Sequence, residues 1–436
     1  MTSHPPPPRW ISLLLRLFIP AVGVIGLVAM ALFYRSNTEL PPIHSDGYGH
    51  YLYLPAVFIQ KDLTMRTEVA EWGENWTPNV DLSYVPETGR YINRFPPGQS
   101  LLMLPSFLLA HAWAHLSGAV KDGFSTPYQT TAAVNGLLAL LVGLTLLRKA
   151  LEELFPPGVV LATLATLTFG TNLFHYATYD AIFSHIYSFA LFAGLLWLVP
   201  RFYREPTPRR ALALGLLMGF VMLVRNSNAL VLLLVPLYGV YSPQTQRERL
   251  AFVRTHWRHV ALVTVAMLAV LLILFSYWRF TTGNWVTYSY KGFPFHFDRP
   301  QFLPVLFSVR KGVFFWAPVL LLAVWGYLRG RQKLAPYMLP VLLIFMLQTY
   351  LVASWWHWPY GSSFGHRAFT EFSALSALGL GAFYASLGPR ARPVVGAFCG
   401  LLVVMQLVLM VQYWRGVIPG DRTTWEQYRG ALLGRR

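Results

Sequence analysis

Long apolar stretches alternate with short polar connections along almost the whole chain. A helix that crosses a lipid bilayer needs about 20 mostly apolar residues, and several stretches approach that length. They cover roughly 11–33, 99–117, 127–147, 158–174, 182–199, 211–224, 227–241, 259–280, 313–328, 336–353, 371–387 and 394–413. This pattern predicts an all-α fold, a polytopic bundle of membrane helices. The shorter stretches are typical of helices that border a cavity within the bilayer.

The composition supports a membrane location. Of the 436 residues, 55% are hydrophobic and only 12% are charged, whereas soluble domains usually carry about 25% charged residues. A water-soluble enzyme is therefore excluded, because its surface would lack charge. The one cysteine, Cys399, excludes an internal disulfide and a cysteine-based zinc site. The sequence contains no phosphate-binding loop or nucleotide fingerprint.

The net charge of +17 is explained largely by topology. Basic residues gather in the short connections that should face the cytoplasm. They are Arg148, Lys149, Arg201, Arg204, Arg209, Arg210, Arg247, Arg249, Arg254, Arg258, Arg329, Arg331, Lys333, Arg390 and Arg392. The alternating loops at 172–181, 281–312 and 354–370 then face outward. The charge thus needs no acidic ligand, and we expect no nucleic-acid partner.

The parity of the crossings decides how the stretch 99–117 is placed. If residues 1–10 form a cytoplasmic tail, the loop that starts at Arg35 faces outward, and if Arg148 and Lys149 are cytoplasmic, the loop at 118–126 also faces outward. We therefore expect it to lie along the outer interface, which leaves eleven spans, with twelve as the alternative. One membrane domain then covers 11–413 and includes a first outer loop at 35–126. The short tail at 414–436 lies outside.

The first candidate for chemistry is an acid just outside the first span. Asp46 stands in His-Ser-Asp-Gly-Tyr-Gly-His-Tyr (44–51), where two glycines remove side-chain bulk and let a substrate approach. A carboxylate there could serve as general base for a hydroxyl group. The structural alternative is an aspartate that caps a turn at the end of a helix.

A second outer acid, Asp180, lies at the next boundary of the membrane, and His185 falls one turn into the apolar stretch that follows. Asp180 could be a second catalytic acid, a metal ligand or the N-cap of the next helix. His185 falls inside an apolar stretch, where a buried histidine with satisfied hydrogen bonds is the commoner case.

Two arginines lie on the outer side, against the usual inside bias of basic residues. Arg94 stands in Asn-Arg-Phe-Pro-Pro-Gly (93–98), and Arg367 ends Gly-Ser-Ser-Phe-Gly-His-Arg (361–367). Arginine at these positions suits phosphate binding. The alternatives are a snorkelling side chain for Arg94 and an ion pair with Glu371 for Arg367. Arg225, followed by Asn226, is a more weakly indicated outer arginine.

The outer loop at 281–312 mixes basic and aromatic side chains, among them Lys291 and Arg310. Such a mixture could bind a phosphate and the face of a sugar, or it could form an amphipathic helix on the outer leaflet. We expect the substrate pocket to include five further side chains: Tyr48, His185, His357, His366 and Glu371.

Taken together, these motifs resemble the integral-membrane glycosyltransferases of fold class C. The similarity is to the bacterial group related to protein O-mannosyltransferases and the lipid A aminoarabinose transferase. It rests on Ser-Asp-Gly-Tyr-Gly (45–49), Asn-Arg-Phe-Pro-Pro-Gly (93–98), Tyr-Asp (179–180) and Gly-Ser-Ser-Phe-Gly-His-Arg (361–367). Each motif alone is weak, but their order extends through nearly the whole chain.

The resemblance implies an enzyme of the bacterial inner membrane with an extracytoplasmic active site. Its donor would be a polyprenyl-phosphate-linked sugar, and its acceptor a hydroxyl group of a glycan, lipid or protein. Asp46 would be the base, Asp180 a second acid, and Arg94, Arg367, Lys291 and Arg310 would bind the lipid phosphate. Asp46 and Asp180 are also the residues that a divalent metal would use, although the sequence requires none. The competing hypothesis is a transporter or flippase of lipid-linked glycans.

Overall fold

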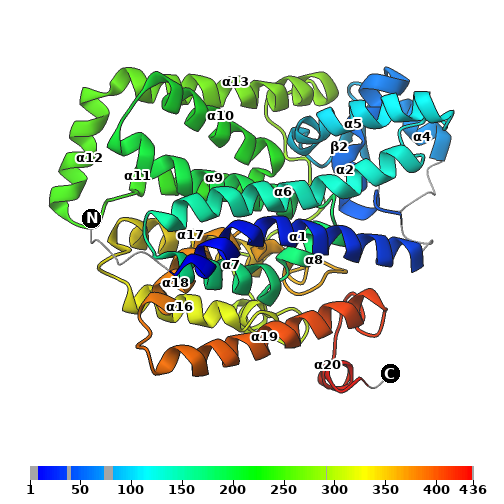
Figure 1. Cartoon of the computed structure of the whole chain (residues 1–436). Helices are drawn as coiled ribbons and strands as arrows, with labels where there is room; N and C mark the ends of the chain where they lie inside the picture. The colour runs from blue at the N-terminus through cyan, green and yellow to red at the C-terminus, as the bar shows by residue number, and fades with distance from the viewer. Residues whose placement is uncertain (1–7, 37–40, 73–81, 291, 435–436) are drawn as a thin grey trace.

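The computed structural model describes residues 8–36, 41–72, 82–290 and 292–434, and they form a bundle of helices that run roughly side by side (Figure 1). The helices of the first half are α1 (Arg9–Ser36), α2 (Ser45–Tyr51), α3 (Tyr53–Pro55), the π-helix η1 (Ala56–Gln60), α4 (Arg66–Trp72), α5 (Gly98–Ser117), α6 (Thr126–Glu152), α7 (Pro157–Gly170), α8 (Leu173–Thr178), α9 (Ser184–Arg204) and α10 (Pro208–Val224). The predicted all-α, polytopic fold is confirmed.

The second half continues the bundle and ends on a short helix. Its helices are η2 (Asn226–Leu233), α11 (Leu234–Leu237), α12 (Pro243–Thr255), α13 (Trp257–Thr282), α14 (Phe302–Phe307), α15 (Val313–Trp316), α16 (Val319–Arg329), α17 (Ala335–Ser354), η3 (Arg367–Phe369), α18 (Ser373–Ala385), α19 (Ala391–Trp414) and α20 (Trp425–Leu432). In the described part, 7 helices are long and apolar enough to cross a membrane. The protein is thus a multi-pass membrane protein, and the number of spans stays a prediction.

Burial distinguishes the centre of the bundle from its lipid-facing surface. Within the most apolar window of α9, 72% of the residues are buried, against 28% for α1 and 22% for α19. An apolar helix can expose most of its surface only where lipid replaces water as its solvent. The central position of α9 brings its first turn, at Ser184, next to the site described below.

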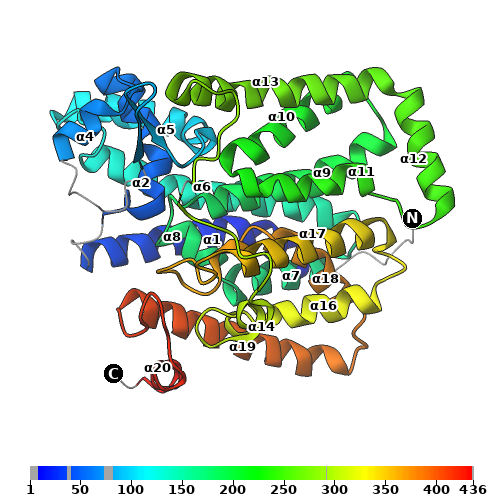
Figure 2. The same cartoon turned by 180° about the vertical axis from the view of Figure 1, so that it is seen from behind.

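The two ends of the bundle differ in architecture. At one end, α12 lies across the helix ends, and at the other α2, α4 and α5 gather (Figures 1 and 2). We call the second the cavity end. The helix α5 packs along the first turns of α6, where Asn135 donates to Ser106 and the ring of His111 lies 2.6 Å from the Tyr128 hydroxyl. The length and apolar composition of α5 would also let it cross a membrane, so its interfacial position stays a prediction.

A β-hairpin that the sequence did not predict lies within the first loop. Strands β1 (Leu82–Val85) and β2 (Arg90–Asn93) pair in antiparallel fashion, with Leu82 opposite Asn93. The hairpin docks on the end of α13, where the Tyr277 hydroxyl accepts from the Asn93 backbone amide at 2.8 Å. It therefore fixes the position of the next residue in the chain, Arg94.

Candidate functional site

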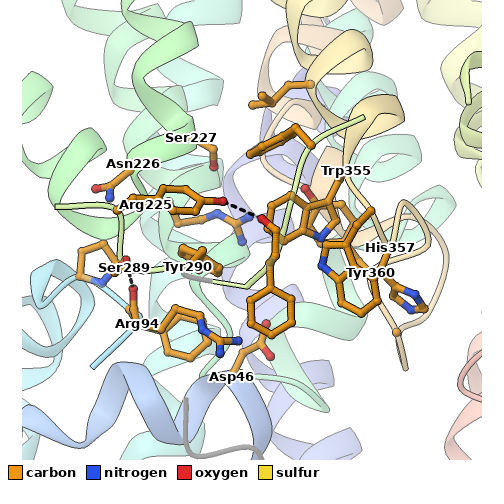
Figure 3. A pocket seen from close by; sticks show the side chains of 18 of the residues that line it. Asp46, Arg94, Arg225, Asn226, Ser227, Ser289, Tyr290, Trp355, His357 and Tyr360 are labelled. Carbon is orange, nitrogen blue, oxygen red and sulfur yellow. Dashed lines mark hydrogen bonds between the residues drawn. The ribbon is translucent and has the colours of Figure 1, made fainter. Parts of the chain in front are cut away.

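A cavity of about 590 Å³ opens at the cavity end of the bundle. Residues from five separate parts of the chain meet on its walls (Figure 3). The lining residues are Asp46, His50, Arg94, Phe95, Pro96, Arg225, Asn226, Ser227, Thr287, Tyr288, Ser289, Tyr290, Phe293, Phe295, Leu351, Trp355, Trp356, His357, Tyr360, Gly361 and Arg367. The lining combines a few charges with many aromatic rings, as is common in sites that bind small organic ligands.

Asp46 and Arg367 form an ion pair on the wall of this cavity. The Arg367 Nη2 lies 3.0 Å from the Asp46 Oδ2, and the two side chains are 13% and 24% exposed. Asp46 sits in the first turn of α2, where the helix dipole favours a negative charge. These two residues are far apart along the chain, and the fold brings them into direct contact. The carboxylate keeps enough exposure to reach a bound molecule.

The glycines on either side of Tyr48 let α2 approach its neighbours closely. A Cβ atom on Gly47 would lie 2.2 Å from the Ile182 side chain, and one on Gly49 would lie 2.3 Å from the Phe95 ring. Any larger residue would therefore push α2 away from both. Packing between neighbouring elements explains these two glycines, so they do not by themselves show that a substrate approaches here.

Arg94 lies against aromatic faces of the outer loop. Its guanidinium carbon is 4.3 Å from the centre of the Phe293 ring and 5.4 Å from that of Tyr290. Its backbone carbonyl accepts from the Ser289 hydroxyl at 2.9 Å. Cation–π contacts hold a guanidinium in place without neutralising it. Arg94 therefore brings a positive charge to the cavity wall.

The segment before Arg367 has an unusual backbone that turns its rings toward the site. Tyr360 adopts the left-handed region with φ 61°, and Gly361 follows with φ 66°. His366 is buried against the rings of Trp358 and Tyr360, and burial lowers its pKa to about 3. His366 is therefore uncharged at neutral pH and packs behind the cavity wall.

Arg225, which the sequence indicated weakly, is the third arginine of the cavity. Its Nη1 donates to the Ser184 hydroxyl at 3.2 Å, and its Nε lies 3.9 Å from a carboxylate oxygen of Glu371. Behind it, the His185 Nδ1 lies 2.9 Å from Glu371, whose side chain is 1% exposed. His185 and Glu371 are thus close to the cavity but form its supporting layer. Glu371 pairs with Arg225 and His185, and the predicted alternative pair with Arg367 does not form.

Asp180 lies apart from the cavity, between two histidines. Its carboxylate oxygens are 3.2 Å from the His44 Nε2 and 2.9 Å from the His175 Nε2. The His175 Nδ1 accepts from the Trp414 indole at 2.9 Å, so His175 must carry its proton on Nε2 and donate to Asp180. Although burial would raise the pKa of Asp180, the two imidazoles hold it below its usual value.

The second ring nitrogen of His44 faces backbone carbonyl oxygens, and these contacts indicate the protonation state of the ring. Its Nδ1 lies 2.8 Å from the Pro41 carbonyl oxygen and 3.1 Å from that of Pro42. Both ring nitrogens therefore face acceptors, which suits a doubly protonated ring. Burial alone would lower the pKa of His44, but Asp180 and these carbonyls raise it. Asp180 thus anchors the residue two positions before Asp46.

The architecture is similar to that of solved membrane proteins. The chain matches ArnT from Cupriavidus metallidurans in the apo state, with a TM-score of 0.50 and 16% identity over 95% of this chain and 69% of that chain. The chain has the fold of the class C membrane glycosyltransferases. No protein-family model matches it, and no curated protein matches its sequence.

Two further solved structures show weaker similarity. ArnT bound to undecaprenyl phosphate has a TM-score of 0.47 at 15% identity, over 96% of this chain and 73% of that chain. The archaeal oligosaccharyltransferase AglB from Archaeoglobus fulgidus, in complex with an inhibitory peptide and a dolichol-phosphate, has a TM-score of 0.44 at 11% identity. The alignment with AglB covers 96% of this chain and 54% of that chain.

Within this class C fold, the predicted site residues divide into three groups. Asp46, Arg94, Arg367 and His357 line one cavity, so the residues on which the resemblance rests most heavily do meet. Asp180, His185, Glu371 and His366 support the walls from behind. The third group does not belong to the cavity lining or lies outside the described residues.

Tyr48, Arg310 and Lys291 make up this third group. Tyr48 is 4% exposed and stacks on Phe124, away from the cavity lining. Arg310 binds Asp421 through two hydrogen bonds of 2.9 and 2.8 Å, which tie the C-terminal segment to the outer loop. Lys291 lies outside the described residues. Arg310 therefore has a structural partner already.

The donor set does not fit a divalent metal. Among residues 8–36, 41–72, 82–290 and 292–434, no group of three or more His, Cys, Asp or Glu side chains is arranged to hold a metal ion. The oxygens of Asp180 face two imidazoles, and Asp46 pairs with a guanidinium. Hard divalent cations prefer several oxygen ligands, so we derive no step through a metal.

Proposed function

We propose that the protein is a membrane glycosyltransferase that moves a sugar from a polyprenyl-phosphate carrier to an acceptor hydroxyl. The observation that carries this proposal is the meeting of Asp46, Arg94 and Arg367 on one cavity. One carboxylate beside several guanidinium groups supplies both a base and an anion site, which glycosyl transfer from a phosphate requires. The fold shared with ArnT supports the same reading.

The transfer itself needs one proton acceptor and one stabilised leaving group. Asp46 takes the proton from the acceptor hydroxyl, and the acceptor oxygen forms a bond to the anomeric carbon. The bond between that carbon and the phosphate oxygen breaks, and polyprenyl phosphate leaves with the electron pair. Because the transition state resembles an oxocarbenium ion, charge that develops on the phosphate must be stabilised by fixed cations. Arg94 and Arg367 are placed on the cavity wall to do so.

Arg367 has two tasks in this scheme. It holds the Asp46 carboxylate at 3.0 Å, which orients the base toward the cavity, and it lines the same cavity, where the phosphate would bind. A planar guanidinium can bridge two anions in this way, whereas a lysine offers only a point charge. The donor lipid is expected to reach the site from the bilayer that surrounds the bundle.

The transporter hypothesis has less support. Alternating access requires polar groups along a path through the membrane. Of the residues that the structure describes, the buried acidic, histidine and lysine side chains, such as His175, Lys311 and Glu371, belong to segments at the cavity end. A site confined to one end suits a reaction on one face of the membrane.

Transfer in proteoliposomes tests the proposal. A synthetic polyprenyl-phosphate hexose and a panel of hydroxyl acceptors would be supplied, and the release of polyprenyl phosphate measured. We expect release with the wild type and its loss with Asp46→Asn. Asp298→Asn, which neutralises an exposed acid outside the cavity lining, is the matched control and should behave like wild type. Undiminished release from Asp46→Asn would remove Asp46 from the role of base.

A further inference from the structure

The charges around the cavity indicate which kind of sugar it can bind. This inference rests on the proposed function. Arg94, Arg225 and Arg367 line the cavity together with one acid, Asp46, among the residues that the structure describes. Two histidines, His50 and His357, also line it. Burial lowers the pKa of both below the usual value, so neither adds a positive charge at neutral pH.

Each acid near the cavity already has a cationic or hydrogen-bonded partner. Asp46 pairs with Arg367 at 3.0 Å. Glu371 lies behind the wall with 1% exposure, between His185 at 2.9 Å and Arg225 at 3.9 Å. An ammonium group on a bound sugar would therefore find no carboxylate in the described lining that is not bonded to a guanidinium or imidazole group.

Aromatic faces are the other environment that accepts an ammonium group. Arg94 already lies over Phe293 at 4.3 Å, and Arg367 lies 5.8 Å from the centre of the Tyr360 ring. Arginine thus occupies ring faces on both sides of the cavity. A second cation beside these guanidinium groups would be repelled, because the low dielectric of a partly buried site strengthens the interaction between like charges.

Neutral polar side chains form the part of the wall opposite Asp46. Asn226 and Ser227 stand at the start of η2, and Figure 3 shows them on the side of Arg225. Their side chains form no hydrogen bond with other described residues. An amide and a hydroxyl group can donate to and accept from sugar hydroxyls, so this part of the wall suits an uncharged ring.

From these observations we infer that the transferred sugar carries no positive charge: the cavity selects a neutral or acidic sugar on its phosphate carrier and disfavours an amino sugar with a free amine. Asn226 is then a residue that determines specificity. The phosphate of the donor is bound by the arginines, and the sugar ring lies against Asn226 and Ser227.

A matched set of lipids tests this inference on the purified full chain in nanodiscs. The probes are polyprenyl phosphate, the same lipid carrying an amino sugar with a free amine, and the N-acetylated form of that donor, which differs chiefly by one charge. We expect the acetylated donor to bind about tenfold more tightly than the free amine at pH 7, since one like-charge contact in such a site is worth at least this factor. Asn226→Asp should remove most of this difference, and the neutral control Asn226→Ser should keep it.

The outcomes separate the two proposals. If polyprenyl phosphate binds but the free amine binds as well as or better than the acetylated donor, the inference about the sugar is overturned and the proposed function stands. The inference is also overturned if Asn226→Asp leaves the preference unchanged, because the sugar then lies elsewhere. If none of the three lipids binds, the proposed function fails, and the inference fails with it.

Discussion

Asp46 and Asp180 occupy similar places in the sequence, each at a predicted outer boundary of the membrane, but the structure surrounds them differently. Asp46 is 24% exposed on a cavity wall and has one arginine partner. Asp180 is 6% exposed and accepts hydrogen bonds on both oxygens from histidines. A carboxylate that must touch a substrate needs exposure, whereas a buried one that holds neighbouring side chains needs full hydrogen bonding. We therefore propose a catalytic role for Asp46 and a positioning role for Asp180.

The largest effect should follow the loss of the exposed acid. Asp46→Asn keeps the shape of the side chain but removes the proton acceptor, and general-base catalysis is typically worth 10²- to 10⁴-fold. We expect kcat to fall by about 10³-fold in the proteoliposome assay. The affinity for polyprenyl phosphate, measured separately, should change little. A loss of affinity equal to the loss of rate would instead indicate a binding role.

Substitutions of Arg367 test whether the shape of its guanidinium group matters in addition to its positive charge. Arg367→Gln should lower kcat by about 10²-fold, because both the base and the leaving phosphate lose a cation. Arg367→Lys should recover only part of the rate, since a point charge cannot bridge two anions. Equal rates for the lysine and glutamine variants would contradict the bridging role.

Arg94 tests the other wall of the same cavity. Arg94→Gln should weaken the binding of polyprenyl phosphate by about 10- to 100-fold, because a partly buried, charge-assisted contact is worth roughly 1.5–3 kcal/mol. Fluorescence competition with a labelled lipid would measure the change. Arg299→Gln, which neutralises an exposed arginine of the loop at 281–312 outside the cavity lining, provides the control. An equal effect there would show that the effect is nonspecific surface charge.

The smallest expected effect is on the thermal stability of the protein, through His44, which is hydrogen-bonded to Asp180. The pKa of His44 is raised in the folded protein, so its contribution to stability is fully present below the unfolded pKa of about 6.5 and is lost as pH rises through the folded value. The melting temperature of the wild type should therefore fall above pH 6.5 by about 1–2 °C more than that of His44→Gln. Parallel melting curves for the two proteins would argue against a charged His44.

Much of this arrangement could be predicted from the sequence. The apolar stretches predicted the helices. A membrane helix satisfies its own backbone hydrogen bonds and needs a long run of apolar residues, which is easy to see in a sequence. Asp46, Arg94 and Arg367 could be grouped because all three lie on the same predicted side of the membrane, where topology gives no reason for arginine. The structure places Asp46 and Arg367 in contact on the wall of one cavity, and their roles there stay a prediction.

Other features depend on contacts between distant segments. The roles of His44 and His175 follow from their convergence on Asp180, which no local pattern encodes. Arg225 stands at the end of α10 and looks like an ordinary boundary residue until Glu371 and Ser184 are placed beside it. The hairpin of β1 and β2 is short, and its residues pack on Tyr277 far along the chain. Such features need the tertiary structure.

The most direct test of the account compares the two acids in one experiment. Single-turnover transfer from bound polyprenyl-phosphate sugar would be measured for Asp46→Asn and Asp180→Asn, each at saturating donor. We predict that Asp46→Asn loses about 10³-fold in the rate of transfer, whereas Asp180→Asn loses only about tenfold, the cost of a less well-oriented base. Equal losses would contradict the division of roles, and full activity of Asp46→Asn would contradict the central claim that this carboxylate is the base.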